Sequence, residues 1–530
     1  MATNRRAARP RSRNGCVTCK IRHVKCDEGK PECLQCQNSG RKCDGYDNAS
    51  QTELRQRIVE RHRPIVRDTF GADHRLVLRQ ETRTERRYVD FFYAQTSHAF
   101  SGFYNSKLWS YLIPQLAEHE PSIRHAMTAI GAIHSRLHNQ NSLPSTEDSA
   151  PTDRFVLEEY NKSIQNLVKA LSSAGGENLH LTLTSCCLFV CLEMLRGNMQ
   201  ESLDHIEAGV RILHKHEQSS PGPSLLSTEL YCELRDLFLR LNLQSSFFGR
   251  LLIPLKLPST DTIRGATFTD FSQSRSLLDQ LMTKSLLFIR SVGIMREERA
   301  PDIQEEFELE QEEIRQDLLA WRYSLDLLVL KHGSKIIPAD LCASLLQRVY
   351  YHTALLWVLT VLSRDENLYD DFIPDFESVV SYSAEIIRIT SSPPPRKEPE
   401  TSPIPTATAT IPDPAFTLDG EIIGPLYYTA CRCRHPAIRR RAIELMSGYP
   451  KREGMWDARL YYAVSKLVTD VEESPCAVPP TSERDIDGLW RVYEEVQPKG
   501  RRDNPTQVIL YLKPDGVDGP WKMRSVVVDW

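Results

Sequence analysis

Residues 16–43 read CVTCKIRHVKCDEGKPECLQCQNSGRKC and hold six of the 14 cysteines in this chain of 530 residues. The segment consists of two halves with the same spacing, in which two residues separate the first two cysteines and six residues precede the third. Two cysteines spaced in this way can hold one zinc ion from a single turn, and zinc requires four ligands. Six thiolates give two ions four ligands each only if two sulfurs bridge, so the count predicts a shared two-zinc cluster. The predicted ligands are Cys16, Cys19, Cys26, Cys33, Cys36 and Cys43.

The remaining cysteines and the termini argue against a disulfide scaffold. Eight further cysteines are scattered over the rest of the chain. Residues 1–14 are polar and basic and lack the apolar core of a secretory signal, which predicts a compartment where thiols stay reduced. The sequence has no stretch of about 18 apolar residues, so it predicts no membrane span and no membrane partner. Clustered cysteines in such a chain favour metal ligation, and two separate zinc fingers would require eight ligands.

Charge is distributed unevenly along the chain. Residues 1–46 contain 11 Lys or Arg and four acidic residues, a net charge of +7, whereas the whole chain carries −4 and the remainder therefore −11. Two zinc ions and six thiolates add −2, which leaves about +5 on a loaded module. A basic head on an acidic body predicts an encounter with a polyanion, with an affinity that falls as salt rises.

The two halves of the cysteine segment differ in charge. In the first, Ile21 and Val24 are three positions apart, so both can pack inward and leave the basic residues between and around them facing out. In the second, residues 37–42 are mostly neutral and end in a basic pair. We expect the first half to enter DNA and the second to complete the cage and contact phosphate; a merely solvated helix face is the alternative. The predicted DNA-contacting residues are Lys20, Arg22, His23, Lys25, Arg41 and Lys42.

These features resemble the fungal zinc binuclear cluster family. The likeness rests on the cysteine spacing, on the basic segment after the second cysteine, and on the Lys30-Pro31 pair before the fourth. In relatives the proline at this place is cis, which the sequence leaves open for Pro31. The resemblance implies one zinc ion on Cys16, Cys19, Cys26 and Cys33, and a second on Cys33, Cys36, Cys43 and Cys16, with Cys16 and Cys33 as the bridges.

The resemblance also implies how the module reads DNA. Family members place the first helix of the module in the major groove and commonly read a CGG triplet. Arg22 and His23 would then reach the base edges. His23 departs from the family pattern, because many members carry lysine at this place.

The rest of the chain predicts a mainly α-helical protein. With 41% hydrophobic and 26% charged residues, the chain can bury a large core. Apolar residues recur at helical spacing from about residue 87, and this periodicity indicates buried helix faces. The tail differs, because residues 506–513 and 523–530 are strand-like and flank a Pro-Asp-Gly turn, which predicts a short C-terminal β-hairpin. Helices are predicted over 122–138, 153–174, 178–197, 201–216, 226–249, 273–294, 303–332, 338–363 and 370–391, and again within 418–470.

Composition divides the chain into a small N-terminal dizinc module and a large all-α domain, which resembles the regulatory region that follows such clusters in fungal regulators. Leu54 and Ile58 are too few apolar residues for a coiled coil after the cysteines. The predicted parts are a basic arm (1–14), the zinc cluster DNA-binding domain (15–45), a charged linker (46–86), the first part of the helical domain (87–390), a Pro-, Ser- and Thr-rich loop (391–414), and the second part with the hairpin (415–530).

Other clusters of chemistry-bearing residues have ordinary interpretations. The three cysteines at 186, 187 and 191 lie in an apolar segment and are predicted to belong to the core rather than to a redox or metal site. His119 and His125 lack the spacing of a zinc-protease helix. The acidic run 305–313 is predicted to be a solvated helix face, with an activation segment as the alternative. The N-terminal arginines 5, 6, 9, 11 and 13 fit either an import or phosphate-contacting arm or a solubilising tail.

The sequence therefore predicts a DNA-binding regulator of RNA polymerase II genes in a fungal nucleus, with two zinc ions as cofactors and double-stranded DNA as partner. A homodimer and a small-molecule effector or co-regulator of the helical body stay open, as do the target genes and the sign of regulation. One alternative is a zinc-stabilised protein-interaction scaffold without specific DNA binding, and another is an enzyme in the helical body. No phosphate-binding loop or nucleophile motif predicts an enzyme.

Overall fold

The structure is a computed structural model, and its described residues fall into two compact units. The first unit contains the cysteine segment, and the second contains the helical body from Thr82 onward. The described residues are 15–43 without 17 and 20–23, 82–140 without 105, 149–173, 178–219, 229–297, 304–391, 416–449, 451–497 and 505–530. The predicted basic arm, and the predicted linker up to residue 81, lie outside them, as does the predicted loop 391–414 apart from Ser391.

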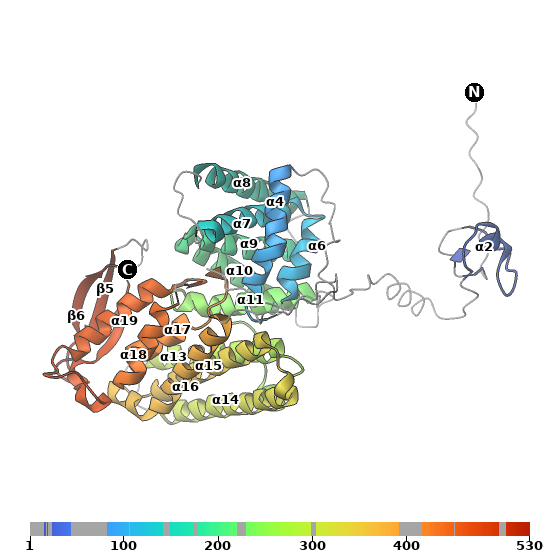
Figure 1. Ribbon diagram of the computed structural model, residues 1–530. Helices are drawn as coiled ribbons and strands as arrows, with labels where there is room; N and C mark the ends of the chain where they lie inside the picture. Colours follow the sequence, from blue (N-terminus) through green and yellow to red (C-terminus); the bar gives the residue numbers. More distant parts are fainter. Residues whose placement is uncertain are drawn as a thin grey trace, which may run out of the picture. The chain divides into compact units, whose positions relative to one another are not determined.

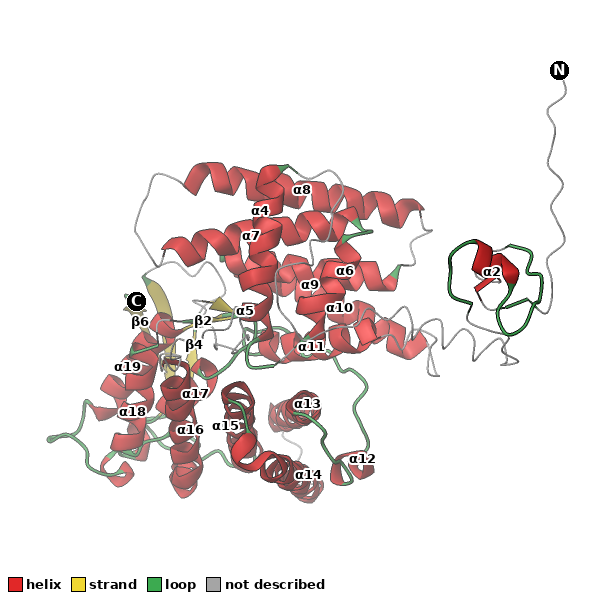
Figure 2. Cartoon of the chain, turned by 45° about the vertical axis from the view of Figure 1, so that its right-hand side comes forward, coloured by secondary structure: helices red, strands yellow, loops and turns green. Residues whose placement is uncertain are grey.

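The helical body is built of two lobes, and the first begins with a strongly capped helix (Figures 1 and 2). The side chain of Thr82 accepts a hydrogen bond from the backbone of Glu85, whose carboxylate in turn accepts one from the backbone of Thr82. This capping box starts α4 at Arg83, ahead of the predicted domain start at 87. The first lobe comprises α4 (Arg83–Phe91), η1 (Phe92–Thr96), α5 (Ser97–Ser101), η2 (Leu108–Leu112), α6 (Ile113–Ala117), α7 (Pro121–Gln140), α8 (Ser149–Ser173), α9 (Leu179–Arg196), α10 (Met199–Ser219) and α11 (Glu229–Ser246).

The core of the first lobe surrounds α7 and α9. Gly131 of α7 allows a close approach of α4, because a Cβ atom there would lie 2.2 Å from the carbonyl oxygen of Tyr88. Helix α9 is apolar and long enough to pass for a membrane span by composition, but 72% of it is buried inside the lobe, as in a core helix. Cys187 and Cys191 are fully buried on α9, which confirms their predicted place in the core.

The second lobe carries the remaining helices and the C-terminal strands. Its helices are α12 (Thr260–Arg264), α13 (Phe271–Glu297), α14 (Gln304–His332), η4 (Gly333–Lys335), α15 (Pro338–Thr360), η5 (Glu366–Phe372), α16 (Ile373–Ser391), α17 (Ile423–Arg432), α18 (Pro436–Ser447), α19 (Ala458–Glu473), η6 (Glu483–Asp485) and η7 (Gly488–Trp490). The long helices match the predicted segments within a few residues. The acidic run 305–313 lies on α14 with most of its carboxylates exposed, which confirms a solvated helix face.

The C-terminal hairpin is confirmed and is part of a larger sheet. Strands β5 (Thr506–Leu512) and β6 (Lys522–Val528) pair antiparallel, and β4 (Val492–Val496) adds a third strand beside β5. The sequence hides β4 because two adjacent glutamates interrupt its alternation, and the register shifts between Val492 and Glu494. A second small sheet joins β1 (Phe416–Thr417), β2 (Arg452–Glu453) and β3 (Trp456–Asp457).

The two lobes share structure at α11 and at the small β1–β3 sheet. Leu241 of α11 packs in the core of the first lobe, whereas Leu243 packs in the core of the second. Phe416, Leu418 and Met455, which neighbour the strands, also pack in the core of the first lobe. The chain therefore returns to the first lobe after it has built most of the second.

Candidate metal centre and nucleic-acid interface

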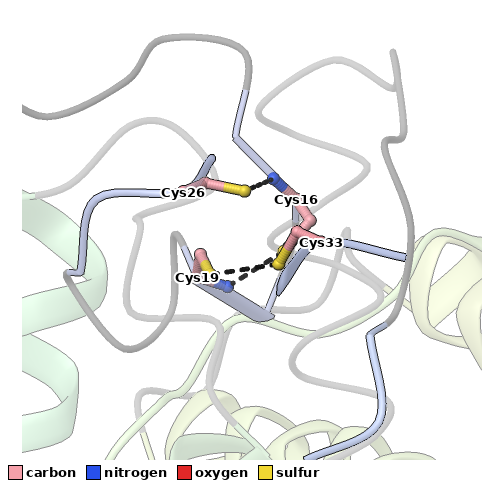
Figure 3. Close-up of side chains that lie close together, drawn as sticks. All are labelled: Cys16, Cys19, Cys26 and Cys33. Carbon is pink, nitrogen blue, oxygen red and sulfur yellow. Dashed lines mark hydrogen bonds between the residues drawn. The ribbon is translucent and has the colours of Figure 1, made fainter. Parts of the chain in front are cut away.

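The six cysteines of the N-terminal unit form one buried cluster, and Figure 3 shows four of them, Cys16, Cys19, Cys26 and Cys33. Their potential ligand atoms form two groups of four, and within each group all atoms lie within 4.8 Å of one another. Both groups contain Cys16 and Cys33, whose sulfurs are 3.5 Å apart. All six are free cysteines rather than disulfides. Six sulfurs can give two ions four ligands each only if two sulfurs belong to both groups, and this is the arrangement found. The first group is Cys16, Cys19, Cys26 and Cys33, and the second is Cys16, Cys33, Cys36 and Cys43.

The two halves repeat in their backbone hydrogen bonds as well as in their spacing. The Cys16 sulfur accepts a hydrogen bond from the backbone N–H of Cys19 at 3.4 Å, and the Cys33 sulfur accepts one from Cys36 at 3.3 Å. The Cys19 carbonyl accepts a hydrogen bond from the N–H of Val24, as the Cys36 carbonyl does from Arg41. The halves are therefore local structural repeats.

Two side chains that sequence reasoning missed hold the halves together. The carboxylate of Asp27 accepts hydrogen bonds from the backbone N–H groups of Leu34 (3.0 Å) and Gln35 (2.9 Å), at the start of α2 (Leu34–Asn38). The bond from Gln35 is the largest cause that lowers the pKa of Asp27. Thr18 donates its hydroxyl to the carbonyl of Lys42 at 3.3 Å. The preference of Asp for helix N-termini could have pointed to Asp27 in the sequence, although Asp27 contacts the start of α2 from a loop several residues away.

The chemistry of the donor set fits zinc. Burial raises the pKa of the Cys33 thiol to about 12 and also raises the pKa values of Cys16 and Cys19. A buried thiolate therefore needs a cation for compensation, and a soft all-thiolate set selects zinc over magnesium or calcium. Two overlapping groups of four match two tetrahedral ions, and neither leaves an open position for catalysis.

A third group of potential ligands lies in the first lobe, at Glu85, His125 and Glu159. The ammonium group of Lys162 pairs with two of these side chains, because its Nζ atom is 2.6 Å from one Glu159 oxygen and 3.8 Å from a Glu85 oxygen. Burial alone would raise the pKa of Glu159, but hydrogen bonds from His125 and Lys162 outweigh it and lower that pKa. The group is an ion-pair network rather than a metal site.

The predicted DNA-contacting residues are only partly placed by the structure. Lys25, Arg41 and Lys42 are all exposed, and Lys25 and Lys42 occupy equivalent positions of the two halves, each next to the last cysteine of its half. The remaining three, Lys20, Arg22 and His23, lie outside the described residues, as does Ile21. Val24 packs against the cysteine cluster as predicted. The Lys30–Pro31 peptide bond is cis.

Comparison with known proteins assigns families to both units. Residues 14–53 match the model of the fungal Zn(2)-Cys(6) binuclear cluster domain. Residues 87–404, more than half of the chain, match the model of the fungal specific transcription factor domain. No solved structure matches the chain significantly.

Relatives with curated names are similar over different lengths. The aspercryptin biosynthesis cluster-specific transcription regulator atnN of Emericella nidulans is 24% identical over 89% of both chains. Transcription regulator lscL of Purpureocillium lilacinum is 27% identical over 37% of this chain and 48% of its own. Adhesion and hyphal regulator 1 of Candida albicans is 63% identical over 35 residues, 7% of this chain and 6% of its own. With its six-cysteine cluster and its matching helical body, the chain belongs to the fungal zinc-cluster transcription regulators, a family whose cofactors are two zinc ions.

Proposed function

We propose that this chain regulates the transcription of RNA polymerase II genes in the nucleus by binding specific double-stranded DNA sites that contain CGG triplets. The observation that supports the proposal most is the pair of overlapping four-cysteine groups, with exposed basic residues on the same small unit. In this proposal all six cysteines ligate zinc. The zinc ions are structural, and we assign the chain no catalytic reaction.

The proposed contacts to DNA divide between the two halves. The first half enters the major groove because it is the more basic one, and the resemblance to the zinc binuclear cluster family assigns the base edges to Arg22 and His23. The proposed phosphate contacts are Lys20, Lys25, Arg41 and Lys42. Bidentate contacts from arginine to guanine are the commonest specific contacts in protein–DNA complexes, which suits a CGG site. The helical body supplies the regulatory input, through an effector, a co-regulator or a second copy of the chain.

Replacing Arg22 with alanine is expected to weaken binding to CGG-containing DNA by about 5- to 150-fold, because one good base contact is worth about 1–3 kcal/mol. Binding to a scrambled duplex should change much less. Gel-shift titration of the zinc-loaded full chain measures both affinities. The matched control is Arg484→Ala, which removes an arginine whose side chain is 89% exposed and lies in the helical body.

The alternative function is a zinc-stabilised scaffold without specific DNA binding, and the histidine at position 23 is the feature that favours it. The double variant Arg22→Ala, His23→Ala separates the two functions. If the wild-type chain shows the same affinity for CGG and scrambled DNA at moderate salt, and the double variant is unchanged, specific reading by this module is refuted.

The salt dependence of binding should report the phosphate contacts. Each neutralised phosphate contributes about −0.9 to the slope of log K against log salt, so Lys42→Gln is expected to reduce the slope by about 1. Sequence preference should stay the same, since phosphate contacts carry no base information. Fluorescence anisotropy between low and moderate salt measures the slope. Lys522→Gln, at an exposed position of β6, should leave it unaltered.

A further inference from the structure

The helical body contains a large cavity bounded by both lobes. Its volume is about 1520 Å³, above the range of about 300–1,000 Å³ typical of small-molecule sites. Residues of α11 and of the connection between α9 and α10 contribute from the first lobe, and residues of α13, α15, α17, α19 and β4 contribute from the second. A molecule bound there would contact both lobes at once.

One wall of the cavity is a continuous series of aromatic rings. Tyr428 lies 6.2 Å from Trp357, measured between ring centroids, and Trp357 lies 5.4 Å from Phe247. Phe247 continues to Trp456 at 6.2 Å, and Trp456 to Tyr427 at 6.1 Å. These rings come from the end of α11, from α15, from α17 and from β3, and all five line the cavity. Neighbouring rings are tilted or perpendicular to one another, with interplanar angles of 88°, 52°, 54° and 50°, so the wall offers separate ring faces and edges against which an aromatic molecule can pack.

A glycine shapes this wall. Gly424 of α17 faces the indole of Trp456, and a Cβ atom at this position would lie 3.2 Å from the ring. The absence of a side chain lets the indole pack directly on the backbone of α17. A larger residue would push the ring away from its place in the wall.

Another part of the cavity is polar, and the positive and negative charges of its side chains balance one another. Arg275 pairs with Asp419 at 2.7 Å and stacks over the ring of Tyr104 at 4.1 Å, and Arg240 reaches Asp419 at 3.3 Å. Asp279 is the second carboxylate of this group, at 3.6 Å from Arg240 and 3.8 Å from Arg275. Two guanidinium groups thus face two carboxylates, so the group attracts neither anions nor cations by net charge.

Two carboxylates of the cavity keep hydrogen-bonding capacity that the described protein does not use. The Oδ2 atom of Asp279 and the Oε2 atom of Glu495 are buried and accept no hydrogen bond from any described residue. The closest cation to Glu495 is Arg432, at 3.7 Å, beyond hydrogen-bond distance. Leaving a buried acceptor without a hydrogen bond destabilises the folded state, and the effect is larger when the acceptor is charged. The buried Oε1 atom of Gln244, another lining residue, is a third acceptor without a partner among the described residues.

The protonation of both carboxylates agrees with this incomplete pairing. Burial raises the pKa of Asp279 to about 6 although Arg275 and Arg240 oppose it. Burial likewise raises the pKa of Glu495 above its usual range, although Arg432 and a hydrogen bond from the hydroxyl of Tyr427 oppose it. Full hydrogen bonding of both oxygens would favour the charged forms instead.

We propose that this cavity binds a planar aromatic molecule that carries hydroxyl or amine hydrogen-bond donors. Its rings pack against the aromatic wall, and its donors form hydrogen bonds with the carboxylates of Asp279 and Glu495, which both line the cavity. As a corollary that rests on the proposed function, such a molecule is the effector of the regulator, because it bridges the two lobes.

A matched pair of probes tests the chemistry directly. 2-Naphthol carries one donor, and 2-methoxynaphthalene has the same ring system with the donor methylated. We expect the full-length protein to bind 2-naphthol about tenfold more tightly, as one hydrogen bond to a charged group implies. Ligand-observed NMR and calorimetry measure both affinities. Equal affinities, or no binding of either probe, would overturn the proposal.

Variants locate the binding. Phe247→Ala removes a ring that is 40% exposed, and it should weaken both probes about threefold to tenfold through lost stacking. Asp279→Asn should reduce the preference for 2-naphthol instead. Trp490→Ala removes an aromatic residue that is 43% exposed and does not line the cavity, so it should change neither affinity. Unchanged binding in Phe247→Ala would place the site elsewhere and refute the assignment.

The probe measurements contain no DNA, so they are independent of the proposed function. Gel shifts with CGG-containing DNA, run in parallel, report the DNA-binding function alone. Probe binding without specific DNA binding would support the cavity and contradict the regulator, and the reverse result would do the opposite. Far-UV circular dichroism of Asp279→Asn checks that this variant folds, and Phe247→Ala provides the test if it does not.

Discussion

The variant Cys33→Ala is expected to lose both zinc ions and, with them, all specific DNA binding. Cys33 belongs to both groups of four potential ligands, so its removal leaves each ion with three. The free energy of zinc binding in such modules is also their folding free energy, about 10–16 kcal/mol for structural zinc at neutral pH. Among the described residues of the module, the buried cluster consists of the six cysteines with Val24 packed against them. Metal analysis should show zinc falling from about two ions per chain to none.

A terminal ligand provides the comparison. Cys43 belongs to one group only, so Cys43→Ala should leave the group around Cys19 and Cys26 complete and retain about one zinc ion per chain. Cys232 is exposed in the helical body, and Cys232→Ala should retain both ions. Equal zinc loss in Cys33→Ala and Cys43→Ala would contradict the distinction between bridging and terminal sulfurs, although not zinc binding itself.

The second large effect is expected at Glu472, a fully buried carboxylate of α19 in the second lobe. Its Oε1 atom accepts hydrogen bonds from Arg434 at 2.9 Å and from the backbone N–H of Val492 at 2.7 Å. Its Oε2 atom accepts hydrogen bonds from Arg434 and from Arg439. One carboxylate of α19 thus joins α18, the residues after α17, and β4. Both arginine side chains are themselves fully buried.

Glu472→Gln is expected to destabilise the second lobe by about 3–5 kcal/mol, because breaking a buried ion pair leaves uncompensated charges. Here Arg439 loses its only ion-pair partner among the described residues, and Arg434 keeps Glu366 at 2.9 Å. Urea unfolding followed by tryptophan fluorescence measures the change at neutral pH. The matched control is the next residue, since Glu473 pairs with the half-exposed Arg440 at 3.0 Å. Glu473→Gln should cost at most about 1 kcal/mol. Similar losses in both variants would refute the central role of Glu472.

The pKa of Glu472 predicts that the stabilising effect of this residue depends on pH. Burial alone would raise the pKa of Glu472, but Arg434 and Arg439 outweigh burial and lower that pKa to about 2. A depressed pKa in the folded state contributes stability above the unfolded value of about 4.3, and this contribution is lost as pH falls toward 2. The difference in stability between wild type and Glu472→Gln should therefore narrow between about pH 4.5 and pH 2. A constant difference over this range would show that the charge of Glu472 is not what stabilises the lobe.

Local sequence patterns were sufficient for most of the elements. The helical periodicity places α7, α9 and α15 within a few residues, because an amphipathic helix carries its own pattern. The hairpin of β5 and β6 is equally local, since a tight turn joins its strands. Strand β4 and helix α12 were missed, because β4 has two adjacent glutamates and a bulge and α12 has only five residues.

The sequence alone determined the chemistry of the metal centre. Cysteine spacing is a local property, and the number of sulfurs fixes the need for two bridges, whereas the choice of Cys16 and Cys33 as these bridges came from the resemblance to the zinc binuclear cluster family. The tertiary structure alone decided what the helical body presents. Glu472 meets Arg434 and Arg439, and Trp357 meets Phe247 and Tyr428, across large sequence separations. No periodicity encodes such contacts, because they depend on how whole helices pack against one another.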